Sequence, residues 1–222
     1  MPRHARRRRD RALAAPAPHL DLATFPTKDL AAGERLWRQH RFRAAPDGGA
    51  WYFASVPATG GGESGRFDLR KPRGTCYLAT TIEAAVRELI GPEQAKLGWV
   101  PASALADRVV TPLALPADVR AANVSSNKAT KFGVTGELCT TSRYGITQIW
   151  ARSFAGAGFD AVWHRLRFTP GKGRGVALFG PSGAPDPAWS TAGHVQPVRP
   201  VIDKLGCPVV HVPATSSLVV NP

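Results

Sequence analysis

One stretch, residues 74–92, decides the fold: GTCYLATTIEAAVRELIGP. Residues 74–79 favour a β-strand, and they lead to Thr80-Thr81, whose hydroxyls suit the N-cap of a helix. From residue 82 onward the apolar side chains recur at i, i+3, i+4, i+7 and i+8, which is typical of one buried helix face. Gly91-Pro92 then predicts the end of that helix. A strand, a cap, a helix and a stop therefore follow one another within twenty residues.

The rest of the chain predicts more strands than helices, in an irregular order. Residues 36–42 alternate bulky and polar side chains, as a half-buried strand does. A second helix is expected from about Tyr144 to Ala157, where Ile146, Ile149, Trp150 and Phe154 share one face and Gly158 follows. Further strands are expected at 159–163, 175–179 and 208–212. This order favours an α+β fold over a doubly wound parallel sheet.

Length and composition set the organisation of the chain. Its 222 residues are 43% hydrophobic and include six tryptophans, as expected for a folded globule. We expect a disordered basic arm over residues 1–19 and a single domain over residues 20–222. The sequence has neither an apolar run of transmembrane length nor an apolar signal-peptide core. These features predict a cytoplasmic protein with no membrane partner.

The net charge of +13 has two sources. Residues 1–13 hold six arginines and one aspartate and so contribute +5, and the rest of the chain contributes +8. The run Arg6–Arg9 is either part of a solvated tail or a segment that binds nucleic acid or anionic lipid. The charge on the remainder suits a cleft that binds an anionic ligand.

Several kinds of site are weakened or excluded by spacing. Three separated cysteines and six scattered histidines match no zinc pattern, so no metal site is expected, and no G-x-S-x-G serine elbow is present. The segment Gly171–Gly175, GKGRG, lacks the P-loop pattern. It is either a phosphate cradle or, as we favour, a hairpin turn.

Two carboxylates on the first predicted helix compete for a functional role. Glu83 lies four residues before Arg87 and is explained by an exposed ion pair. Glu88 also lies off the apolar stripe, and periodicity alone does not distinguish it from Glu83.

A series of short segments resembles the RES domain family, named for its arginine, glutamate and serine. The tyrosine of the third segment precedes Glu88 by eleven residues, as in the family. The match covers about residues 34–180. The matching segments, in chain order, are Leu36-Trp37-Arg38, Ser64-Gly65-Arg66-Phe67-Asp68, Tyr77-Leu78-Ala79, Tyr144-Gly145-Ile146-Thr147-Gln148-Ile149-Trp150-Ala151, Phe159-Asp160-Ala161 and Ala177-Leu178-Phe179.

The resemblance implies an ADP-ribosyltransferase-like fold, with a central split β-sheet and a few flanking helices. It also implies an NAD-degrading toxin that cleaves the nicotinamide–ribose bond, with NAD as substrate and no metal. The acceptor is then water or inorganic phosphate, or a macromolecule if the protein is an ADP-ribosyltransferase. The implied partner is a separate antitoxin that carries a DNA-binding domain. A basic nucleic-acid-binding module without catalysis is the non-enzymatic alternative.

Site roles follow from the same resemblance. Glu88 is expected to stabilise positive charge on the ribose, and Arg38 and Arg66 to hold the diphosphate. Tyr77 offers a ring face and a hydroxyl to the nicotinamide, and Ser142 or Tyr144 supplies a further hydrogen bond. The family serine is either Ser142 or is lost at Leu166, because Trp163-His164-Arg165-Leu166 stands where the family often carries it.

Overall fold

The computed structural model describes residues 13–45, 49–58 and 64–211, and its core is one eight-stranded sheet. Neighbouring strands are antiparallel except for one parallel pair, which a crossover containing the second long helix connects. Across the sheet the strands are β1 (Thr27–Leu30), β6 (Val119–Asn123), β7 (Ala161–Arg165), β8 (Arg174–Pro181), β3 (Arg73–Ala79), β2 (Arg35–Arg41), β5 (Arg108–Ala114) and β9 (Gln196–Pro197).

The helices and a small second sheet complete the fold. The α-helices are α1 (Ile82–Leu97), α2 (Glu137–Thr140), α3 (Tyr144–Gly156) and α4 (Arg199–Lys204). Short 3₁₀ helices are η1 (Ala102–Leu105) and η2 (Asn127–Phe132), and β4 (Val100–Pro101) pairs in parallel with β10 (Val209–Val210). The predicted α+β class is confirmed. Across the described residues, no helix combines the length and the apolar character needed to span a membrane.

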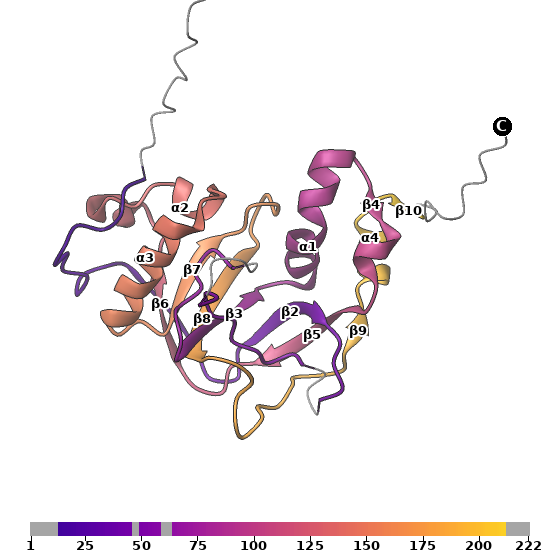
Figure 1. The fold of residues 1–222 in the computed structure, drawn as a ribbon, viewed down its shortest axis with the longest axis horizontal. Coiled ribbons are helices and arrows are strands. Elements are labelled where there is room, and N and C mark those ends of the chain that lie inside the picture. The colour runs from indigo at the N-terminus through magenta and orange to yellow at the C-terminus, as the bar shows by residue number, and fades with distance from the viewer. Residues whose placement is uncertain (1–12, 46–48, 59–63, 212–222) are drawn as a thin grey trace, which may run out of the picture.

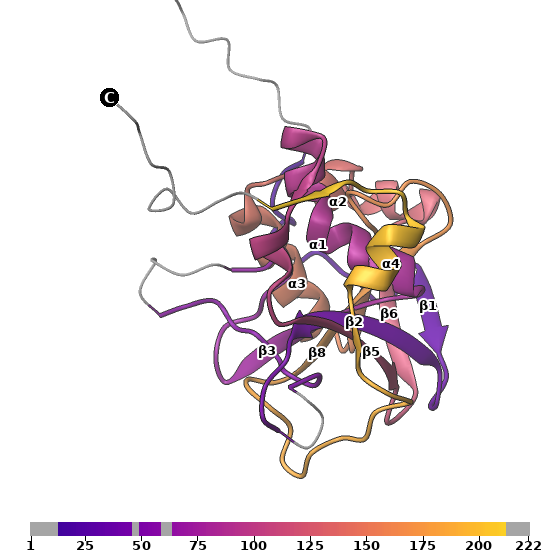
Figure 2. The same ribbon diagram turned by 90° about the vertical axis from the view of Figure 1, so that its right-hand side faces the viewer.

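The sheet is divided near its middle, as the prediction of a split sheet requires. Strands β2 and β3 are joined by one register pair, Trp37 with Ala79, whereas β3 pairs with β8 over seven residues. In Figure 1, α2 and α3 lie over the half with β6, β7 and β8, and α1 and α4 lie over the half with β2, β5 and β9. Figure 2 shows the same helices above the sheet from the side. The helices therefore form two groups on one face of the sheet, one over each half.

Three apolar clusters hold these layers together. The first packs α3 on β6, β7 and β8 around Trp150, Phe154 and Phe159. The second packs α1 and α4 on the other half, around Val86, Ile90 and Ile202. The third covers the opposite face of the sheet and is built around Trp51 and Phe53, with Trp189 against it. Both faces of the central strands are thus covered.

Helix α1 begins as predicted but ends later. The Thr81 hydroxyl caps it by accepting from the backbone N–H of Ala84 at 3.1 Å. The predicted stop at Gly91-Pro92 is wrong, because the helix continues through Pro92 to a left-handed Gly98, whose N–H donates to the carbonyl of Gln94 at 2.8 Å. Gly91 instead provides room for Phe168, since a Cβ there would lie 2.2 Å from its ring.

The N-terminal boundary also differs from the prediction. Leu13 is buried in the first cluster, and its N–H donates to Glu137 at 2.7 Å. The indole N–H of Trp150 donates to the carbonyl of Ala14 at 2.9 Å. The folded part therefore begins before residue 20. The run Arg6–Arg9 and residues 212–222 lie outside the described residues.

Candidate active site

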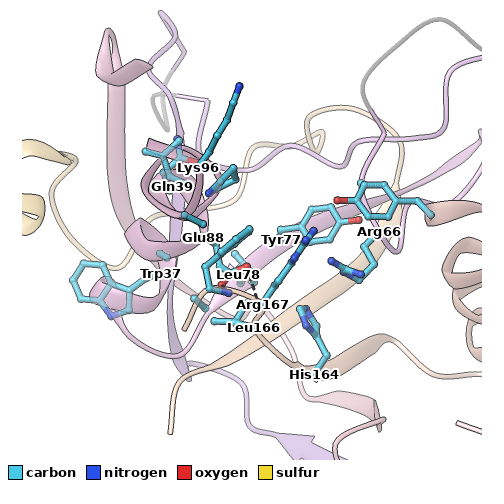
Figure 3. Close-up of a pocket in the computed structure, with 18 residues that line it drawn as sticks. Trp37, Gln39, Arg66, Tyr77, Leu78, Glu88, Lys96, His164, Leu166 and Arg167 are labelled. Atoms are coloured by element: carbon cyan, nitrogen blue, oxygen red, sulfur yellow. Dashed lines mark hydrogen bonds between the residues drawn. The ribbon is translucent and has the colours of Figure 1, made fainter. Parts of the chain in front are cut away.

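A pocket of about 770 Å³ opens above the division of the sheet, between α1 and α3. Its size lies within the roughly 300–1,000 Å³ range of small-molecule sites. Figure 3 shows the side chains that converge on it. It is lined by Trp37, Gln39, Gly65, Arg66, Tyr77, Leu78, Ala79, Ala85, Glu88, Leu89, Pro92, Ala95, Lys96, Tyr144, His164, Leu166, Arg167 and Phe168.

Glu88 lies on the wall that α1 presents to the pocket, and the β7–β8 loop holds its carboxylate. One oxygen accepts from the N–H of Phe168 at 2.7 Å and the hydroxyl of Thr169 at 3.1 Å, and the other from the N–H of Arg167 at 3.3 Å. Burial raises the pKa of Glu88, and these hydrogen bonds oppose the rise. Glu83, by contrast, is exposed and outside the pocket. The structure thus separates the two carboxylates that periodicity left equivalent.

Arg66 reaches the pocket from a loop that α3 anchors. The Thr147 hydroxyl donates to the carbonyl of Arg66, and the Gln148 amide donates to the carbonyl of Gly65 at 2.9 Å. The Arg66 guanidinium donates to the carbonyl of Thr141 and lies over the Tyr144 ring, 5.2 Å from its centroid. Burial lowers its pKa, yet an arginine stays charged at any physiological pH. The segments around Arg66 and Tyr144 therefore form one supported unit.

The Tyr77 hydroxyl is held inside the protein. It accepts from the N–H of Phe67 at 2.8 Å and donates to Asp68 at 2.8 Å. Asp68 is buried, and its other oxygen accepts from the N–H of Gly65 at 2.5 Å. Burial raises the pKa of Tyr77 well above its usual value. A ligand in the pocket would meet the Tyr77 ring, while the hydroxyl braces the loop that carries Arg66.

The position of Arg38 contradicts the prediction that this residue holds the diphosphate. Successive side chains of a strand point to opposite faces, and on β2 it is Trp37 and Gln39 that line the pocket. The Arg38 guanidinium donates to the carbonyl of Ala50 and, at 3.1 Å, to the thiol sulfur of Cys76 on the opposite face of the sheet. Arg38 therefore supports the segment packed under the sheet and is not part of the pocket.

The two candidate serine positions have different outcomes. Ser142 is exposed and does not line the pocket, so its predicted binding role is not supported. Leu166, where the family often has serine, does line the pocket and presents an apolar side chain there. A hydroxyl that does reach the Glu88 carboxylate comes from Thr169, three residues further along the same loop.

Sequence reasoning missed four polar side chains of the pocket: Gln39, Lys96, His164 and Arg167. Lys96 was beyond the predicted end of the helix, and Arg167 follows the Leu166 position without any motif of its own. His164 was noted only as part of the segment that replaces the serine. The pocket therefore has three basic side chains, Arg66, Lys96 and Arg167, and one acidic side chain, Glu88. This excess of positive charge suits an anionic ligand.

The segment Gly171–Gly175 joins the turn between β7 and β8 to the first two residues of β8, so the favoured hairpin interpretation holds for residues 171–173. The Arg174 guanidinium donates to the carbonyls of Gly171 and Gly173, both at 2.9 Å. This turn lines a second hollow of about 460 Å³, together with Arg165 and Arg167. Within the described residues, no group of three or more histidine, cysteine, aspartate or glutamate side chains is placed to hold a metal ion.

Comparisons with known proteins identify a family and include a solved structure of similar fold. The family model of the RES domain matches residues 35–197. A solved structure described as the M. tuberculosis MbcT-MbcA toxin-antitoxin complex is similar to this fold, with a TM-score of 0.49 and 15% sequence identity over 68% of this chain and 76% of that chain. No curated protein matches the sequence.

Proposed function

The chain belongs to the RES domain family, and from this premise we propose that it is an enzyme that cleaves the nicotinamide–ribose bond of NAD. The observation that carries the proposal is Glu88, a half-buried carboxylate held by three hydrogen bonds at the wall of a basic pocket. The proposed biological role, which rests on the family resemblance, is that of the toxin in a toxin–antitoxin pair. The antitoxin would be a separate chain with a DNA-binding domain.

The chemistry needs a fixed negative charge beside the ribose. When the bond between ribose C1′ and the pyridinium nitrogen breaks, its electron pair leaves with neutral nicotinamide and positive charge develops on the ribose. A preorganised carboxylate stabilises that charge without reorganising. The N–H groups of Arg167 and Phe168 and the Thr169 hydroxyl hold Glu88 in place before substrate binds. An acceptor oxygen then bonds to C1′ and gives up its proton.

Two arginines fit the diphosphate of the dinucleotide. Arg66 and Arg167 both line the pocket, and Arg66 is braced by the Thr141 carbonyl and the Tyr144 ring. A guanidinium binds phosphate oxygens through paired N–H donors. Arg167 thereby takes the place in the proposal that the sequence had assigned to Arg38. The Tyr77 ring supplies a flat surface for the nicotinamide.

The decisive experiment measures release of nicotinamide from NAD by the purified protein, with and without inorganic phosphate. Glu88→Gln keeps the size of the side chain and removes its charge, so we expect at least a roughly hundredfold loss of rate. Glu83→Gln, on an exposed position of the same helix, is the matched control and should keep the wild-type rate. Equal release by Glu88→Gln and wild type would contradict the role of Glu88.

The product identifies the acceptor in the same assay. Free ADP-ribose indicates water, a phosphorylated ADP-ribose indicates phosphate, and label retained on a macromolecule indicates ADP-ribosyl transfer. Absence of nicotinamide release both with and without phosphate would overturn the proposed function itself.

A further inference from the structure

The His164 ring lies over a gap in the sheet that a glycine leaves open. In the register of β3, β8 and β7, Ala79, Gly175 and His164 form one row across three strands. A Cβ on Gly175 would lie 2.5 Å from both Cε1 and Nε2 of the ring. The Nε2 edge of His164 therefore extends over Gly175 toward β3, the strand that brings Tyr77 to the pocket.

The backbone selects one tautomer of this ring. Nδ1 lies 2.9 Å from the carbonyl oxygen of Arg165, which only accepts hydrogen bonds, so Nδ1 carries the proton. Nε2 is then a hydrogen-bond acceptor. Phe67 packs against the ring at a centroid distance of 5.0 Å, and burial lowers the pKa of His164 to about 4. The nearby Arg66 guanidinium also disfavours a charged ring.

The three basic side chains of the pocket can only donate hydrogen bonds. Arg66, Arg167 and Lys96 offer only N–H groups, and Glu88 already accepts three hydrogen bonds from the β7–β8 loop. Within the described part of the chain, no hydrogen bond to Nε2 of His164 is formed. Figure 3 shows the ring beside Arg66, on the Tyr77 side of the pocket. A ligand with an N–H or O–H at this place would find its acceptor there.

We propose that Nε2 of His164 accepts a hydrogen bond from the nicotinamide riboside half of NAD, either from the carboxamide N–H or from a ribose hydroxyl. This inference rests on the proposed function and makes His164 a substrate-binding residue.

Two substitutions separate this role from a structural one. Asparagine places an amide N–H near Nδ1, so His164→Asn retains the donor to the Arg165 carbonyl and loses the pocket acceptor. Glutamine reaches the Nε2 position, so His164→Gln retains an acceptor in the pocket and loses the bond to Arg165. We expect His164→Asn to raise KM for NAD about fivefold, as for a lost neutral hydrogen bond, and His164→Gln to stay within about twofold of wild type.

The opposite order, with His164→Asn like wild type and His164→Gln impaired, would overturn the inference, and so would wild-type KM in both variants. Thermal unfolding at pH 7.5 checks that each variant is folded. If His164→Asn does not fold, His164→Gln decides: a KM near wild type supports the inference and a raised KM overturns it. A wild-type protein that releases no nicotinamide refutes the proposed function instead, so the two failures are distinct.

A substrate analogue identifies the donor. Nicotinic acid adenine dinucleotide carries a carboxylate in place of the carboxamide and has no N–H to donate. If the carboxamide is the donor, His164→Asn raises KM for NAD more than KM for this analogue, so the difference between the two KM values becomes smaller. If a ribose hydroxyl is the donor, the variant weakens both substrates equally, and the inference stands in either case.

Discussion

Acidification should destabilise the protein through His164, because its buried ring resists protonation. The side chain is 6% exposed, and its pKa falls from 6.5 to about 4 in the folded protein. Below pH 6.5 the unfolded chain binds a proton on this side chain that the folded chain does not. The stability that His164 contributes is therefore fully present above pH 6.5 and is lost as the pH falls toward 4.

The size of the effect follows from these two pKa values. Between pH 7.5 and pH 5 the linkage relation gives a loss of about 2 kcal/mol in the free energy of unfolding. For a chain of this length that loss corresponds to a fall of about 4–8 °C in Tm. Asp68 and Glu88, whose pKa values burial raises, act in the opposite direction over the same range. The difference between wild type and a variant is therefore the quantity to measure.

Urea unfolding of wild type and His164→Asn at pH 7.5 and pH 5 isolates the contribution. Between pH 7.5 and pH 5 the free energy of unfolding should fall by about 2 kcal/mol more in the wild type than in the variant, since asparagine does not titrate. His194→Asn, at an exposed position, should follow the wild-type curve. The reasoning would be refuted if the free energy of unfolding changed with pH equally in wild type and His164→Asn. That result would mean that the folded protein accepts the proton on His164.

Two further predictions test the geometry of the sheet. Arg38→Gln should lower the free energy of unfolding without changing KM for NAD, because the side chain lies on the face away from the pocket. Arg66→Gln should raise KM about tenfold or more, because Arg66 lines the pocket. Equal effects of the two variants on KM would contradict the placement of Arg38 outside the pocket. Gly175→Ala should cost about 1–3 kcal/mol of stability through its overlap with His164. Gly145→Ala, which meets no atom within 4 Å, should be neutral or slightly stabilising, and urea unfolding distinguishes the two.

The strand–helix unit at residues 74–90 was predictable because short-range forces specify it. The strand propensity of residues 74–79 and the Thr81 cap act between neighbours, and the apolar stripe acts within two helical turns. The end of the helix was not predictable from Gly91-Pro92. That pair is a stop by local rules, but Gly91 accommodates Phe168 from a loop nearly eighty residues away. Such a contact overrides a local preference.

The order of the family motifs predicted part of the pocket. Glu88, Arg66, Tyr77 and Tyr144 come from four separate segments, and the fold brings all four to one pocket. Their spacing carried that information even though no single motif was specific. The Tyr77 hydroxyl was assigned to the ligand, whereas in the fold it bonds to Asp68. Side-chain hydrogen bonds of this kind depend on the loop that packs above the strand.

The sequence alone determined that the chain is α+β, where its first long helix begins, and which carboxylate the family pattern selects. Tertiary structure decided which face of β2 forms the pocket, and so excluded Arg38. Both faces of that strand are covered, hence alternation of polar and apolar residues could not distinguish them. It also brought His164 and Arg167 to the pocket that Glu88 lines, through the pairing of β7 with β8 and the loop between them. No local sequence pattern predicts that residues so far apart in the chain share a pocket, because only the register of the sheet and the packing of α1 bring them together.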